Sequence, residues 1–149
     1  MAETHATFNK ILVPVDCTEP RQEVIDYAVE LAQQHNGELV LLYVVESPIF
    51  PVEMMDIDLR MEEVAEHAGQ RLATLVEQAI GNAANARHLV AQGSISDQIV
   101  ATADRESVDV IVMATDEHSE IRKFLVGSIT ERVVRHAHQP VLALHVKTS

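Results

Sequence analysis

Short runs of apolar residues alternate along the chain with segments that have helical periodicity. The apolar runs cover residues 11–15, 39–45, 108–114 and 141–146. Short, nearly continuous apolar runs of this kind are typical of strands that are buried on both faces of a parallel sheet. Residues 88–91 form a shorter and more polar run, so we predict that they form a strand at an edge of the sheet.

Apolar residues between these runs recur at the spacing of one helix face. The first such stripe consists of Val24, Ile25, Ala28, Leu31 and Ala32. Similar stripes in residues 61–79, 95–103 and 129–137 predict three further helices. Thr18 is a candidate N-cap of the first helix, and Pro20 suits its first turn.

Two further signals mark where helices begin and end. Asn36-Gly37 is a stop signal for the first helix, and Ser94 or Ser96 is a candidate cap of the third.

The element order βαβαβαβαβ predicts an α/β fold, a single doubly wound sheet of five parallel strands with helices on both faces. Since 149 residues can enclose one core, we expect a single domain over residues 1–149.

Charge excludes one class of partner. The chain holds 11 Lys and Arg against 23 Asp and Glu, a formal net charge of −12. Proteins that bind nucleic acid need clustered basic residues, whereas the lysines here, Lys10, Lys123 and Lys147, are scattered. We therefore expect no nucleic-acid partner and no attachment to an anionic membrane surface.

The cellular compartment is suggested by three features. Cys17 is the only cysteine, the first seven residues contain no apolar stretch, and the longest apolar run is residues 39–45. A membrane helix needs about 20 apolar residues, and an intramolecular disulfide needs two cysteines. We expect a cytoplasmic protein without a membrane span.

Candidate chemistry lies where the predicted strands end, because doubly wound sheets bind ligands at the carboxyl ends of their strands. Asp16, Glu46 and Thr115 follow such ends, and Gly127-Ser128 begins a helix whose N-terminus favours an anion. The irregular stretch 46–56 either overhangs a ligand site or is a hydrophobic loop pinned to the core or to a partner. No catalytic triad, paired catalytic carboxylates or metal-binding motif is evident, so we expect neither catalytic residues nor a metal.

Four segments of this chain resemble the universal stress protein family. They are ILVPVD at 11–16, DVIVMAT at 109–115, LVGSITERVVRHA at 125–137 and QPVL at 139–142. The resemblance implies a Rossmann-like (HUP-type) sheet of strand order 3-2-1-4-5 and a stress-response protein. It also implies a homodimer paired through the last strand, with the interface at Val141, Leu142, Ala143, Leu144, His145 and Val146.

Many members of that family bind ATP or AMP through the pattern G-x2-G-x9-G-S/T. On this chain the pattern falls on Ala114, Glu117, Gly127 and Ser128, so the final pair and the spacing match while both earlier glycines are replaced. The resemblance implies ribose at Asp16 and adenine near Val44. The nucleotide-binding residues expected on this basis are Pro14, Asp16, Val44, Ala114, Thr115, Gly127, Ser128 and Ile129.

The two replacements of a pattern glycine, Ala114 and Glu117, differ in their expected effect on nucleotide binding. Ala114 adds one methyl group, whereas Glu117 adds bulk and a negative charge near Asp116 and Glu120. Two like charges about 4 Å apart repel by about 1 kcal/mol in water and about 4 kcal/mol at an effective dielectric of 20. Glu117 therefore disfavours a triphosphate and leaves AMP or a bare anion open. Arg122, Lys123 or Mg²⁺ could offset the repulsion, and a loop that points away from the site would remove it.

Two functions from different classes follow. The first is a stress-response binding protein with a partly degenerate nucleotide site, which acts through protein partners. The alternative is a nucleotide-responsive protein with the phosphates at Gly127-Ser128. Slow ATP hydrolysis has the least support, because no motif positions a catalytic base. An apolar last strand at a sheet edge also favours homodimerisation, since pairing with a second copy would cover it.

Overall fold

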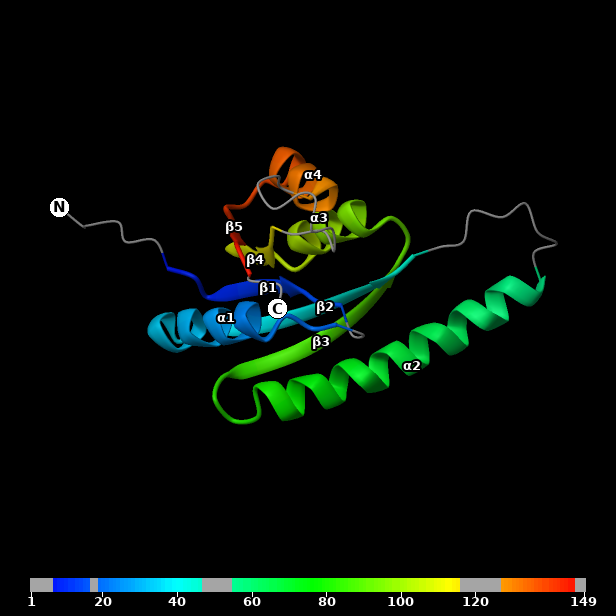
Figure 1. Cartoon of the computed structure of the whole chain (residues 1–149), viewed down its shortest axis with the longest axis horizontal. Helices are drawn as coiled ribbons and strands as arrows, with labels where there is room; N and C mark the ends of the chain where they lie inside the picture. The colour runs from blue at the N-terminus through cyan, green and yellow to red at the C-terminus, as the bar shows by residue number, and fades with distance from the viewer. Residues whose placement is uncertain (1–6, 17–18, 47–54, 116–126, 147–149) are drawn as a thin grey trace.

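A computed structural model of the chain describes residues 7–16, 19–46, 55–115 and 127–146. Five parallel strands form one sheet in the order β3-β2-β1-β4-β5, which confirms the predicted fold and strand order. The elements follow one another as β1 Lys10–Pro14, α1 Gln22–His35, β2 Glu38–Val45, α2 Met55–Ala79, β3 Asn85–Gln92, α3 Ile95–Arg105, β4 Val110–Ala114, α4 Ser128–His136 and β5 Val141–Leu144 (Figure 1).

The central strands are buried on both faces, which explains their uninterrupted apolar sequence. Alternate residues such as Ile11 and Val13 in β1 pack with α1 and α2, while Leu12 between them belongs to the core under α3 and α4. All three side chains are fully buried. Helices therefore cover both faces of the sheet, as the element order predicts. The polar run at 88–91 lies in β3, which is an edge strand as expected.

Several predicted boundaries differ from the structure. Helix α1 begins at Gln22 with Arg21 as its N-cap, so the prediction of Thr18 as N-cap and Pro20 in the first turn is wrong. Arg21 has extended backbone angles, so the first helical turn can begin only after it, at Gln22. Ser94, and not Ser96, is the N-cap of α3.

The last strand and the second helix also differ from their predicted bounds. Strand β5 ends at Leu144, so His145 and Val146 follow it instead of forming its end. Helix α2 begins at Met55, so the irregular stretch expected to reach Asp56 is shorter, and residues 47–54 lie outside the described part of the chain.

Polar groups tie the amino ends of the strands together. Asp109 Oδ2 accepts hydrogen bonds from the amides of Asn9 (2.8 Å) and Lys10 (3.0 Å). Arg87 forms ion pairs with Glu38 and Glu106, each at 2.6 Å. Hydrogen bonding to Arg87 holds the pKa of Glu106 below its ordinary value. None of the helices in the described residues is long and apolar enough to cross a membrane.

Candidate functional site

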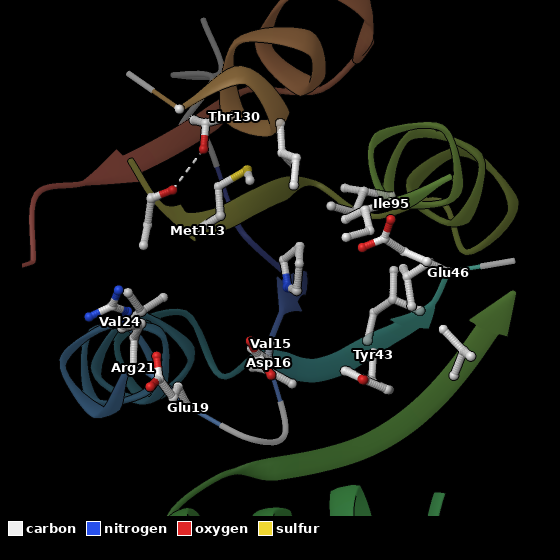
Figure 2. A pocket seen from close by; sticks show the side chains of 18 residues that line it. Val15, Asp16, Glu19, Arg21, Val24, Tyr43, Glu46, Ile95, Met113 and Thr130 are labelled. Atoms are coloured by element: carbon white, nitrogen blue, oxygen red, sulfur yellow. Dashed lines mark hydrogen bonds between the residues drawn. The ribbon is translucent and has the colours of Figure 1, made fainter. Parts of the chain in front are cut away.

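A cavity of about 380 Å³ opens at the carboxyl ends of β1, β2 and β4 (Figure 2). The chain winds from β1 to β2 and β3 in one direction and continues from β4 to β5 on the other side of β1. Sheets of this kind bind ligands at such a reversal. A volume between about 300 and 1,000 Å³ is usual for a small-molecule site.

The floor and one wall of the cavity are apolar. Met113 and Val44 are the penultimate residues of β4 and β2, and Ile95 and Ile99 approach from the first turns of α3. Ile99 and Val44 are buried, with 1% and 7% of their surface exposed. Apolar side chains of this kind suit the faces of a flat ring.

Charged side chains lie around the mouth. Figure 2 shows Glu19 and Arg21 beside α1, Asp16 at the end of β1, and Glu46 across the cavity near Ile95. Asp16 is exposed just beyond the carboxyl end of β1, the central strand. Carboxylates accept hydrogen bonds, so this rim suits hydroxyl and amino groups of a ligand better than it suits additional anions.

Helix α4 is fixed to the end of β4 by two hydrogen bonds. The Gly127 amide donates to the Thr115 carbonyl at 2.7 Å, and the Thr130 hydroxyl donates to the Ala114 carbonyl at 2.8 Å, the dashed line in Figure 2. Gly127 is the N-cap of α4, and a glycine offers no side-chain acceptor to the first-turn amides. The N-terminus of α4, which favours an anion, therefore borders the cavity.

Six of the eight predicted nucleotide-binding residues line this cavity: Pro14, Asp16, Val44, Ala114, Gly127 and Ile129. The other two, Thr115 and Ser128, are not among its lining residues. Thr115 is buried with 4% of its surface exposed, and Ser128 is exposed. Glu117, Arg122, Lys123 and Cys17 lie outside the described residues.

Sequence analysis missed part of the lining. Ile95 and Ile99 were assigned only to the buried stripe of α3, although a stripe facing a carboxyl-end cleft also lines that cleft. Tyr43 and Met113 lie in the last three residues of β2 and β4, and the signal for them is that residues near the carboxyl ends of such strands line the ligand site. No sequence motif marks Arg21 as a lining residue, because its position beside the cavity depends on where α1 begins.

The described residues contain no group of three or more His, Cys, Asp or Glu side chains that could hold a metal ion. The arrangement instead combines an apolar lining, hydrogen-bond acceptors at the rim and an anion-favouring helix N-terminus. A doubly wound parallel sheet with a cavity at its winding reversal defines an α/β domain of the Rossmann-like class.

The particular family follows from comparison with known proteins. The model of the Universal stress protein family matches residues 7–145, and the chain belongs to that family. Universal stress protein G of Shigella flexneri is 32% identical, over 92% of this chain and 99% of the relative. The universal stress protein of Methanothermobacter thermautotrophicus is 31% identical, over 87% of this chain and 90% of the relative.

Solved structures share the fold. The universal stress protein UspA from Lactobacillus plantarum superposes with a TM-score of 0.77 at 26% identity, covering 94% of this chain and 99% of that one. A universal stress protein in complex with cAMP has a TM-score of 0.61 at 20% identity. Another, from Archaeoglobus fulgidus in complex with dAMP, has a TM-score of 0.58 at 19% identity. At the identities of these last two, the likeness extends to the fold alone.

Proposed function

We propose that this universal stress protein binds an adenosine monophosphate and acts through that binding rather than through catalysis. The observation that carries the proposal is the convergence of Asp16, Val44 and Gly127 on one cavity. These residues come from the ends of β1 and β2 and the start of α4. They are the positions expected for ribose, adenine and phosphate.

Each part of a nucleotide has a chemically suited neighbour. The apolar part of the lining, which includes Val44 and Ile99, takes the adenine ring, and the Asp16 carboxylate accepts hydrogen bonds from ribose hydroxyls. The first turn of α4 receives the phosphate, because its amides and dipole favour negative charge. The solved relatives described with cAMP and dAMP support a monophosphate, since each ligand carries a single phosphate group.

A monophosphate is preferred over a triphosphate for an electrostatic reason. The rim already holds Asp16, Glu19 and Glu46 against Arg21. Glu117, outside the described residues, occupies a position at which the family pattern has glycine. Every further phosphate adds negative charge beside these carboxylates.

Calorimetric titration with AMP and with ATP tests the proposal. We expect AMP to bind more tightly than ATP. Ser128→Asp should weaken AMP binding by about tenfold through charge repulsion, while stabilising the start of α4. Asn85→Asp makes the same charge change at the exposed start of β3, at the other end of the sheet, and should leave the affinity unchanged.

Two results would contradict the proposal. Absence of heat with both nucleotides at millimolar concentration would remove nucleotide binding altogether. Glu117→Gly should increase the affinity for ATP more than the affinity for AMP. An equal increase for both nucleotides would contradict the electrostatic explanation of the preference for a monophosphate.

A second function is favoured by the replacement of two pattern glycines by Ala114 and Glu117. In that case the site is degenerate and the protein acts through protein partners alone. The titration separates the two functions, because only the first requires the wild-type protein to bind nucleotide.

The working form of the protein is part of the proposal. We propose one universal stress protein domain over residues 1–149, located in the cytoplasm and paired into a homodimer. The interface consists of β5 and the two residues after it, that is Val141, Leu142, Ala143, Leu144, His145 and Val146. In the described part of the chain β5 pairs only with β4, so its outer edge is available to a second copy.

A further inference from the structure

Thr115 connects the last strand of the sheet to the helix that borders the cavity. Its amide donates to the Leu144 carbonyl at 2.9 Å, which continues the pairing of β4 with β5. Its carbonyl accepts the Gly127 amide at 2.7 Å. The peptide groups on both sides of Thr115 therefore link the end of β5 to Gly127, the N-cap of α4.

The side chain of Thr115 has its own partner. Thr115 Oγ1 lies 3.1 Å from Nδ1 of His145, a residue that follows β5 and is itself exposed. Thr115 is 4% exposed, so its hydroxyl is shielded from water. A shielded hydroxyl without a partner is unfavourable, and the chain around it shifts to regain one.

We infer that His145 is a positioning residue for the phosphate end of the cavity. It is not among the residues that line the cavity. Its ring fixes the Thr115 hydroxyl, Thr115 holds the Gly127 amide, and Gly127 sets the first turn of α4 at the cavity rim. This inference deepens the proposed function, and its first test does not depend on nucleotide.

The first test measures hydrogen exchange at the Gly127 amide of the full-length protein. His145→Ala should speed that exchange by about three- to tenfold, as expected when one hydrogen bond that supports the turn is lost. His145→Asn should restore protection, because its side-chain amide offers a donor and an acceptor near the position of Nδ1. His138→Ala is the matched control, since it also removes a histidine hydrogen bond, at the Asp104 carboxylate, and should leave Gly127 unchanged.

The second test measures AMP affinity by titration. His145→Ala should weaken AMP binding by about three- to tenfold, and His145→Asn should remain close to wild type. Thr115→Val should have a similar effect, and the double variant should be no weaker than either single variant, because both changes break the same contact. Sedimentation of each variant separates this effect from a change in self-association.

Each result either supports or overturns the inference. Unchanged Gly127 exchange in His145→Ala, failure of His145→Asn to restore protection, or additive effects of the two substitutions would overturn it. If wild-type protein binds no nucleotide, the proposed function fails while the exchange measurement still decides the role of His145.

Discussion

At the scale of single residues, Asn36 and Gly37 end α1 for two different physical reasons. Asn36 has a φ of +53°, the left-handed region that ends many helices. Gly37 is required for another reason, because a Cβ there would lie 2.4 Å from the Phe8 carbonyl oxygen. The sequence Asn36-Gly37 predicts the end of the helix correctly, but only the fold brings Phe8 against it.

Gly37→Ala should destabilise the protein by about 1–3 kcal/mol, because the backbone of residue 8 must move to admit the methyl group. Gly69→Ala is the matched control within α2. A Cβ there meets only Val90 Cγ2, at 3.9 Å, so helix propensity should stabilise the protein by about 0.5–1 kcal/mol. Urea denaturation measures both free energies of unfolding. Equal signs for the two substitutions would contradict the steric explanation.

At the scale of elements, the end of α3 is joined to the segment between α4 and β5. Gln139 Nε2 donates to Asp104 Oδ1 at 3.0 Å, and His138 Nδ1 lies 3.2 Å from the same carboxylate. These hydrogen bonds, first that of Gln139 and then that of His138, hold the pKa of Asp104 below its ordinary value. A carboxyl with a lowered folded-state pKa stabilises the fold above its unfolded pKa, and the contribution is lost as pH falls through the folded value.

Asp104→Asn should therefore lower the free energy of unfolding at neutral pH, and the difference from wild type should narrow as the pH falls below about 4. Urea denaturation at neutral and at acidic pH measures this difference. In a Gln139→Ala background the Asp104→Asn effect should be smaller, because the main cause of the lowered pKa is absent. A difference that does not change with pH would exclude the carboxylate as its source.

At the scale of the whole molecule, self-association depends on the open edge of β5. The carbonyls of Pro140 and Leu144 accept hydrogen bonds from Ile111 in β4 and from Thr115 just after it. The backbone groups of the alternate residues, Val141 and Ala143, therefore face the other way. A two-fold partner would pair with those groups.

Ala143→Pro should give a folded monomer, because proline is tolerated on an open edge but cannot donate across the interface. Ala143→Ser retains the amide and should remain a dimer. Light scattering at micromolar concentration measures the mass. A wild-type monomer, or a dimer of Ala143→Pro, would contradict the proposed interface.

Most of the fold could be predicted from sequence because each central strand is buried on both faces and thus reads as a continuous apolar run. Less of the candidate site could be predicted from the sequence. Asp16 and Gly127 were found because motifs mark them, whereas Ile99 belongs to a helix stripe that does not distinguish core from cavity. The start of α1 was misplaced because Thr18 and Pro20 have capping propensity, while the backbone angles of Arg21 depend on the surrounding fold.

The parallel sheet separates two groups of residues in space. The cavity lies at the carboxyl ends of the strands, while Arg87, Asp109 and their partners lie at the amino ends. A strand of five residues spans about 16 Å, and effects of substitutions more than about 10 Å apart usually add. Substitutions at the amino ends of the strands can therefore raise the free energy of unfolding without altering which ligand the cavity prefers. Such variants would provide a tolerant background in which the carboxyl ends can be re-engineered, or can diverge during evolution, toward a different ligand.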